Sequence, residues 1–242
     1  MIFLGVSVST YLQINEQRKA EKRQRVAKFR YRAREGQDLY DQFYEVPIGR
    51  DARISIMQYI IQNLSKALEI DPSQKDVRQS LNYLTSKIKE PEAPADKSRH
   101  ALSNNAQELI ALMGKLRKLM HYLHRLSKIP GIDSSIANKG LHSIRLLYLE
   151  LQTQSFVVVG KMAMSESKWG LAKQHFDSAK KVLLQQNITS SKTQAVLEEL
   201  NQLLDDIKSR KKEETNILSK QFEEENADER EKDTLFQPKK KW

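Results

Sequence analysis

Two histidines stand at a spacing that metal sites use, so they are the first side chains to consider for chemistry. His121 and His124 are three residues apart in a segment of helical periodicity, which places both on one helix face. A zinc site needs further nitrogen, sulfur or carboxylate ligands, and no Glu-x-x-His pair or second cluster accompanies these two. The chain also contains no cysteine. We therefore expect no metal site.

Sequence motifs for nucleotide binding and nucleophilic catalysis are not found either. The chain contains no Gly-x-Gly-x-x-Gly, no Gly-x-x-x-x-Gly-Lys-Ser/Thr and no Gly-x-Ser-x-Gly. Gly114-Lys115-Leu116 lacks both the loop and the hydroxyl residue of a phosphate-binding lysine motif. We therefore predict that the protein is not an enzyme and that it uses no cofactor.

Basic residues form the clearest chemical pattern in the middle of the chain. From Lys115 to Lys128 there are five Lys or Arg residues and no acid. At about 100° per residue, most of them fall opposite an arc of leucines, although Lys115 flanks that arc. Such a face can meet phosphate, anionic lipid or an acidic helix, and a merely solvated face is the simpler interpretation. The residues that define this basic patch are Lys115, Lys118, Arg125 and Lys128.

The N-terminal segment joins an apolar stretch to a basic one. Residues 1–14 carry no charged side chain, and residues 15–34 carry nine Lys or Arg against two Glu. The apolar stretch is shorter than the roughly 17–25 residues of a spanning helix, but a switch from apolar to basic is typical of an anchor with a cytoplasmic domain. We predict a single-pass N-terminal anchor in the inner or plasma membrane, with an interfacial helix, or a cytoplasmic protein whose first helix packs on its own core, as alternatives. The membrane-proximal bases, expected at an anionic membrane surface, are Arg18, Lys19, Lys22, Arg23 and Arg25.

The remaining pattern indicates an all-α protein. The chain has 242 residues, 39% of them apolar, and a net charge of +10, which allows one or two domains. Apolar residues recur every three or four positions, and breaks are predicted at Pro47 to Gly49, at Asp71-Pro72 and at Pro130-Gly131. We predict a candidate anchor at 1–14, a basic juxtamembrane helix at 15–45, a helical hairpin at 51–89, a linker at 90–97, a helical domain at 98–210, and a charged helix with a disordered tail at 211–242.

One segment of the helical domain resembles a tetratricopeptide repeat (TPR), a helix–turn–helix unit of about 34 residues. Phe156-x-x-Val159-Gly160 stands where that family has Trp-x-x-Leu-Gly, and Ala172-x-x-x-Phe176 matches its Ala-x-x-x-Phe. The interval from Gly160 to Ala172 is 12 residues, as the repeat requires. The small residues permit close approach of two helices, and the two aromatic rings fill the space around that contact.

The resemblance is incomplete. Ala163 stands where the family has Tyr, and Leu184 stands where its closing Pro is common. A second segment, from Leu64 to Pro72, resembles only the end of another repeat. Because a self-supporting array needs at least three repeats, the resemblance implies a TPR-like helical domain and not a regular solenoid.

A TPR-like domain implies a groove between paired helices in which a partner's peptide or helix can dock. The residues expected near that groove are Phe156, Trp169, Lys173 and Phe176. We therefore predict a membrane-tethered cytoplasmic scaffold or adaptor that binds a protein partner. The alternative is a nucleic-acid-associated basic helical protein, although interleaved exposed aromatic residues would make it stronger. The charged C-terminal helix is also compatible with a homo-oligomer formed through a coiled coil.

Overall fold

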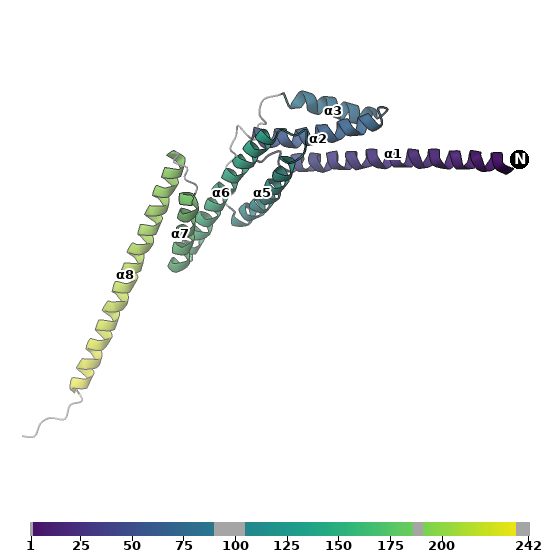
Figure 1. The fold of residues 1–242 in the computed structure, drawn as a ribbon. Helices are drawn as coiled ribbons and strands as arrows, with labels where there is room; N and C mark the ends of the chain where they lie inside the picture. Colours follow the sequence, from purple (N-terminus) through teal and green to yellow (C-terminus); the bar gives the residue numbers. More distant parts are fainter. Residues whose placement is uncertain (1, 90–104, 186–190, 236–242) are drawn as a thin grey trace, which may run out of the picture. The chain divides into compact units, whose positions relative to one another are not determined.

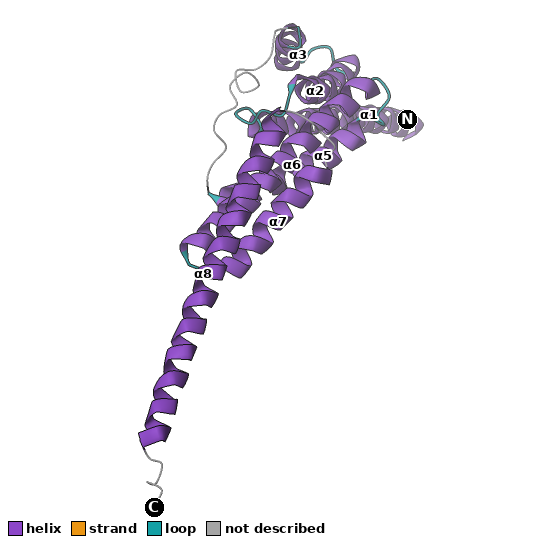
Figure 2. Ribbon diagram, turned by 90° about the vertical axis from the view of Figure 1, so that its left-hand side faces the viewer, coloured by secondary structure: helices purple, strands orange, loops and turns teal. Residues whose placement is uncertain are grey.

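The computed structural model describes residues 2–89, 105–185 and 191–235, and every regular element in these ranges is a helix, as Figure 1 and Figure 2 show. The helices are α1 (Ile2–Gln42), α2 (Arg50–Ile70), α3 (Lys75–Lys87), α5 (Ala106–Leu126), α6 (Ser134–Ser165), α7 (Trp169–Gln185) and α8 (Ser191–Leu235). The prediction of an all-α fold is therefore confirmed, and the three predicted breaks lie between helices. The predicted linker at 90–97 lies outside the described residues.

The helices belong to two compact units. The first unit comprises residues 1–103 and 110–150, and the second comprises residues 104–109 and 151–242. The helix α6 contributes its residues up to Glu150 to the first unit and its residues from Leu151 onward to the second. The first unit thus contains α1, α2, α3, most of α5 and the first half of α6, whereas the second contains α7 and α8.

A hairpin of α1 and α2 is the base of the first unit. Gly49 has a φ of 88°, a conformation that glycine adopts at no steric cost, and it ends the turn that follows α1. Arg53 is buried beneath this turn, and its Nη2 donates hydrogen bonds to the carbonyl oxygens of Tyr44 (3.2 Å) and Val46 (2.8 Å). A cation at this place satisfies carbonyl groups just beyond the C-terminus of α1 and is favoured by the helix dipole.

The turn between α5 and α6 packs against α2. The rings of Tyr59 and Tyr122 meet edge to face, with their centroids 5.8 Å apart. Gln62 donates a hydrogen bond from Nε2 to the carbonyl oxygen of Pro130 at 2.5 Å. The large apolar side chains of this unit that are fully buried are Phe43, Ile48, Ile56, Ile60, Leu116, Leu119, Leu123, Leu126 and Ile144.

The second unit is a hairpin of α6 and α7, covered by the first part of α8. A hydrogen bond from the amide of Lys168 to the carbonyl oxygen of Ala163 (2.9 Å) closes the turn. Phe176 is fully buried beside Gly160, where an added Cβ would lie 2.5 Å from the aromatic ring. The buried residues of this core are Ala163, Ala172, Phe176, Ala179, Leu183, Leu200, Leu204 and Ile207.

Long parts of α1 and α8 carry side chains that pack on nothing described. α1 has 41 residues, and every side chain from Tyr11 to Arg25 is exposed. The described residues 11–14 therefore do not pack on the chain's own core. α8 has 45 residues, and none of its described side chains beyond Ile207 is buried. Among the described helices, none combines the length and the apolar content that a membrane crossing requires.

Candidate functional site

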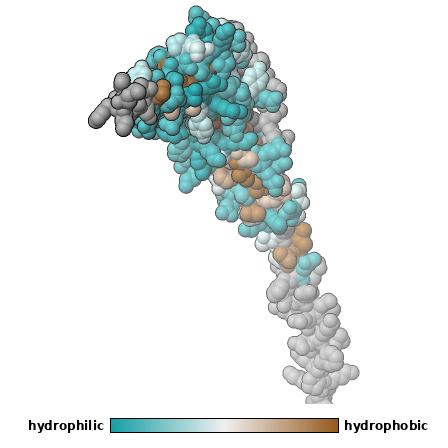
Figure 3. All heavy atoms as spheres, turned by 90° about the vertical axis from the view of Figure 1, so that its right-hand side faces the viewer, coloured by the Kyte–Doolittle hydropathy of each residue, from teal (hydrophilic) through white to brown (hydrophobic). Residues whose placement is uncertain are grey.

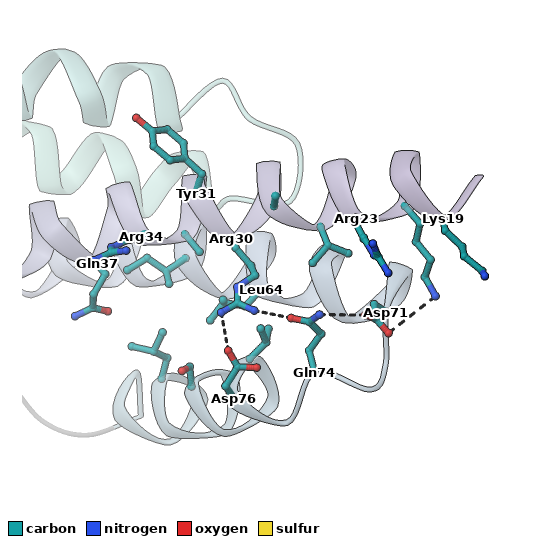
Figure 4. Close-up of a pocket in the computed structure, with 18 residues that line it drawn as sticks. Lys19, Arg23, Arg30, Tyr31, Arg34, Gln37, Leu64, Asp71, Gln74 and Asp76 are labelled. Carbon is teal, nitrogen blue, oxygen red and sulfur yellow. Dashed lines mark hydrogen bonds and ion pairs between the residues drawn. The ribbon is translucent and has the colours of Figure 1, made fainter. Parts of the chain in front are cut away.

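A groove in the first unit runs between α1 and α3, with α2 at its base (Figure 4). Its volume is about 880 Å³, within the roughly 300–1,000 Å³ that ligand-binding clefts occupy. The apolar residues that line it are Val26, Ala27, Ala33, Ile60, Leu64, Val77 and Leu84. Six of these seven side chains are buried, and Ala27 is the exposed one. The apolar lining therefore forms a recessed floor.

The helix α1 supplies a basic wall above this floor. At about 100° per residue, its lining bases fall within an arc of about 120°, which is one face of the helix. These bases are Lys19, Lys22, Arg23, Arg30 and Arg34. On the opposite side, the acidic residues that line the groove are Asp71 and Asp76. The lining residues thus have an excess of three positive charges, and the groove favours an anionic occupant.

Arg30 crosses the groove and connects its two walls (Figure 4). Its Nη1 donates to Oε1 of Gln74 at 2.6 Å, and its Nη2 lies 2.6 Å from Oδ2 of Asp76. A longer ion pair joins Nζ of Lys22 to Oδ1 of Asp71, with 3.9 Å between these atoms. The side chains of all four charged residues are partly exposed. Exposed pairs of this kind contribute about 0–1 kcal/mol each, so an occupant can displace them.

Asp71 shapes the turn between α2 and α3. Its Oδ1 accepts hydrogen bonds from the hydroxyl (2.7 Å) and the amide (3.3 Å) of Ser73, and its Oδ2 accepts one from Nε2 of Gln74 (3.0 Å). The hydrogen bonds from Ser73 and then Gln74 lower the pKa of the Asp71 carboxyl below its ordinary value of 3.8. The carboxylate therefore holds Gln74 where it meets Arg30.

The C-terminal end of α3 is held to α1 by a lysine among three tyrosine rings. Nζ of Lys87 lies 5.4 Å from the ring centroid of Tyr83, 5.6 Å from that of Tyr40 and 6.0 Å from that of Tyr44. Burial lowers the pKa of Lys87, but the hydrogen bond to the Tyr83 hydroxyl and the nearby phenol groups outweigh it, so the pKa is raised. Cation–π contacts thus position α3 at the end opposite Asp71.

Two arginines of the basic wall, Arg23 and Arg34, form no ion pair with a described acid. Both side chains are exposed at the rim of the groove. Arg30 and Lys22, by contrast, are paired across it. A guanidinium group presents several donors in a fixed plane and suits carboxylate or phosphate groups. These two arginines are therefore available to bind the anionic groups of an occupant.

The residues predicted at the TPR-like groove lie mainly inside the second unit. Phe176 is fully buried, and Phe156 and Trp169 pack, partly buried, against the same core. The guanidinium carbon of Arg210 lies 5.3 Å from the centroid of Trp169. Lys173 is exposed on α7, where its Nζ lies 2.6 Å from Oδ2 of Asp177. Of the four residues, Lys173 is the one whose polar group faces solvent.

The predicted basic patch lies on the outer face of α5. Lys115, Lys118, Arg125 and Lys128 are all exposed, and the leucines of the opposite arc, Leu116, Leu119, Leu123 and Leu126, are buried. The guanidinium carbon of Arg125 lies 5.4 Å from the ring centroid of Tyr122. The described acids form no ion pair with the three lysines of this patch.

The predicted membrane-proximal bases occupy the exposed part of α1. Arg18 and Arg25 are exposed and form no ion pair with a described acid, and Lys19 pairs with Glu16 at 3.0 Å. Lys19, Lys22 and Arg23 also line the groove. His121 and His124 are exposed on α5, and the described residues contain no group of three His, Asp or Glu side chains placed to hold a metal ion.

Sequence reasoning missed the groove and four of its charged residues, Arg30, Arg34, Asp71 and Asp76. A signal for the basic wall exists: Val26 and Ala33 recur on the same helix face as the bases that line the groove. No local pattern indicates that α3 stands beside this face.

Comparisons of the chain with protein-family models, with curated proteins and with solved structures gave no significant match. The resemblance to a TPR therefore depends on the residues of the α6–α7 hairpin alone. The features that bear on function are then the groove and the exposed, charged side chains described on α1, α5 and α8.

Proposed function

We propose that this protein is a helical scaffold at a membrane surface that binds an acidic amphipathic helix of a partner protein in the groove between α1 and α3. The observation that carries the proposal is the pair Arg23 and Arg34, which form no ion pair with a described acid and lie above a recessed apolar floor. An apolar floor with a charged rim is the usual design of a surface that takes an amphipathic helix.

The dimensions of the groove support a helix as the occupant. The α1 residues that line it run from Lys19 to Gln37, a helix length of about 27 Å at 1.5 Å per residue. An occupant of this length presents apolar residues at every third or fourth position to the floor. Carboxylates beside that stripe reach the guanidinium groups of the basic wall.

The exposed part of α1 supports attachment to a membrane. Tyr11, Leu12 and Ile14 are 69%, 57% and 44% exposed, and the membrane-proximal bases follow directly. Apolar side chains insert at the lipid boundary, and each nearby base adds about 1 kcal/mol of attraction to anionic headgroups. We propose that residues 1–14 tether the chain to the inner or plasma membrane, with both units on the cytoplasmic side.

In this proposal the TPR-like hairpin offers a second contact surface. Met162, Leu171 and Leu184 are exposed in the second unit, and Lys173 lies on the same hairpin. One face of the molecule, drawn in Figure 3, is mainly hydrophilic, with small groups of apolar side chains in its lower half. Scattered apolar residues contribute less to recognition than a formed groove, so the first unit is the primary site.

A binding experiment with a designed peptide tests the groove. The peptide is an amphipathic helix with a leucine stripe flanked by glutamates, and its affinity is measured by calorimetry. We expect Arg23→Glu/Arg34→Glu to weaken binding at least tenfold. The matched control Arg25→Glu/Arg32→Glu reverses two exposed charges of α1 that do not line the groove, and it should change the affinity less than threefold. Equal losses in both variants would contradict the proposal.

Membrane attachment is tested by fractionation of cells that express the full chain or a version that starts at Glu16. If residues 1–14 tether the protein, only the full chain stays with the membrane after a carbonate and high-salt wash. Release of both versions by salt indicates electrostatic attachment through the bases alone. A soluble full chain would contradict the tether.

Nucleic-acid binding is the second candidate function, and the exposed lysines of α5 are the observation that favours it. Affinity that depends on phosphate contacts falls steeply as salt rises. Lys115→Glu/Lys118→Glu should abolish binding to a DNA or RNA duplex and leave capture of the acidic peptide unchanged. If the unmodified chain shows no salt-dependent binding to nucleic acid, this function is excluded.

A further inference from the structure

The distal part of α8 is a helix whose described side chains contact no core. Among the described side chains of α8, Ile207 is the last buried one, at 2% exposure, and those from Lys208 to Gln221 are all exposed. The helix continues to Leu235, which adds 28 residues, or about 42 Å, beyond Ile207. Isolated helices in water are marginal because most helical stability comes from packing of one face. We therefore expect packing against a partner to stabilise this part of α8.

The composition of this segment is that of an acidic amphipathic helix. From Glu213 to Leu235 the sequence has nine acids against three bases, a net charge of −6. Ile217 and Leu218 are 57% and 65% exposed, which is unusual for two adjacent large aliphatic side chains. At 3.6 residues per turn, Glu225 and Asp228 fall on the helix face that carries these two residues. The segment thus presents an apolar pair followed by acids on one face.

We infer that the groove between α1 and α3 takes this acidic part of α8 from a second copy of the chain. The inference rests on the proposed function, because it names the partner of the same groove. The two surfaces are complementary: an excess of three positive charges lines the groove, and the segment from Glu213 carries a net charge of −6. Opposite charges on two surfaces of one chain favour contact between copies and disfavour contact between like surfaces.

The apolar parts also match. Ile217 and Leu218 would enter the recess above Val26, Leu64 and Val77, where the cavity leaves room for side chains. With α8 parallel to α1, Glu225 would then reach Arg34, because Glu225 lies eight residues, or about 12 Å, beyond Ile217 and Arg34 lies as far beyond Val26. The Arg30–Asp76 pair spans the groove but is exposed, with 47% and 61% of the side chains accessible, so an entering helix can displace it.

This contact joins two different surfaces of the chain, so it is head-to-tail. Each copy then keeps one free groove and one free α8 end, and assembly continues unless a ring closes. At a membrane surface, α1 would hold the copies in one layer. The expected assembly is salt-sensitive, since exposed charges supply much of the attraction.

A charge-exchange experiment tests the inference on the full chain. Two forms with different affinity tags are mixed, and capture of one by the other is measured together with sedimentation of the untagged chain. Arg34→Glu changes only the groove, and Glu225→Lys changes only α8. We expect each variant alone to lose at least tenfold in self-capture. A mixture of the two variants should regain it, because the reversed groove then meets the reversed helix.

Matched controls separate this contact from a general effect of charge. Arg32→Glu on α1 and Glu223→Lys on α8 alter the same number of charges away from the inferred contact, and each should change self-capture less than threefold. Far-UV circular dichroism of every variant verifies that the helices remain. Raising the salt to about 1 M, where the Debye length is near 3 Å, should dissociate the unmodified assembly.

The outcomes distinguish this inference from the proposed function. If the designed acidic peptide binds the groove but differently tagged chains do not capture each other, the groove binds helices and the α8 occupant is wrong. Self-capture that the mixed variants fail to restore also overturns the inference. If neither the peptide nor a second copy binds, both proposals fall.

Discussion

Gly140 of α6 and Ala52 of α2 meet backbone to backbone. A Cβ added at Gly140 would lie 2.6 Å from the amide nitrogen of Ala52 and 2.7 Å from its Cα. Real Cβ contacts are not that short, and a backbone atom cannot rotate away as a side chain can. The crossing of these two helices in the first unit therefore requires glycine at this position.

Replacement of that glycine should destabilise the first unit. We expect Gly140→Ala to lower the free energy of unfolding by about 1–3 kcal/mol, because the two helices must separate. Gly114→Ala is the matched control: it lies in α5, where an added Cβ meets nothing within 4 Å, and it should raise stability by about 0.5–1 kcal/mol. Urea denaturation followed by far-UV dichroism measures both, and equal effects would contradict the close crossing.

The corresponding contact in the second unit is between Gly160 and Phe176. We expect Gly160→Ala to cost about 1–3 kcal/mol, since its Cβ would lie 2.5 Å from a ring that is fully buried. Gly170→Ala, with nothing within 4 Å of the added Cβ, is the control. The double variant Gly160→Ala/Phe176→Leu should lose less stability than the two single variants lose in sum, because the smaller leucine side chain makes room for the added Cβ. Additive losses would show that the two positions are not in contact.

Arg53 should be essential for the turn between α1 and α2. Its removal leaves the carbonyl oxygens of Tyr44 and Val46 without this donor, and hydrogen bonds to a charged group contribute roughly 1.5–3 kcal/mol. We expect Arg53→Ala to lower the free energy of unfolding by at least about 2 kcal/mol. Arg53→Lys should recover less than half of the loss, because an ammonium group lacks the planar fork. Arg50→Ala, at an exposed position of the same helix, should have little effect.

Tyr122 carries a buried hydroxyl with no hydrogen-bond partner among the described residues. Burial, followed by the nearby Tyr59 and Glu35, raises the pKa of this phenol. A polar group buried without a partner is unfavourable, so Tyr122→Phe should leave stability unchanged or raise it by about 1 kcal/mol. Tyr148→Phe is the contrast, since the Tyr148 hydroxyl accepts a hydrogen bond from Arg117 at 2.8 Å and its loss should lower stability. A marked destabilisation by Tyr122→Phe would reveal an additional partner of that hydroxyl.

The turn at Asp71 should weaken in acid. Because the pKa of Asp71 is lowered in the folded state, its stabilising effect is fully present above the ordinary value of 3.8 and is lost as the pH falls through the lower folded value. Thermal melts of the unmodified chain should therefore lose stability below pH 4 more steeply than melts of Asp71→Asn. Asp38→Asn, an exposed substitution on α1, controls for the general loss of carboxylate charge. If the thermal stability of all three chains depends on pH in the same way, Asp71 does not stabilise the turn through its carboxylate.

The sequence predicted the helices well because each has its own local signal. Apolar residues at helical spacing and breaks at Pro47, Asp71-Pro72 and Pro130-Gly131 marked where helices end. The small residues of the α6–α7 hairpin also indicated a close helix pair, which Gly160 and Phe176 form. These features depend on residues that are close in the sequence, so the sequence alone is enough to predict them.

The groove could not be predicted in the same way, because it depends on packing between distant segments. Arg30 meets Gln74 and Asp76 across more than forty residues of sequence. Arg23 and Arg34 were read simply as parts of a basic segment, since only the position of α3 makes them part of a wall. Lys173 and its aromatic neighbours were chosen from a repeat pattern, which indicates where a hairpin packs but not which side chains remain free.

The division of the chain into two units also separates its chromophores. All eight tyrosines lie in the first unit, and Trp169, the tryptophan among the described residues, lies in the second. Fluorescence excited at wavelengths that only indole absorbs therefore follows the second unit, whereas tyrosine signals in the near ultraviolet follow the first. One unlabelled sample can thus report whether the two units melt together or apart, since coincident transitions are the mark of a single cooperative step.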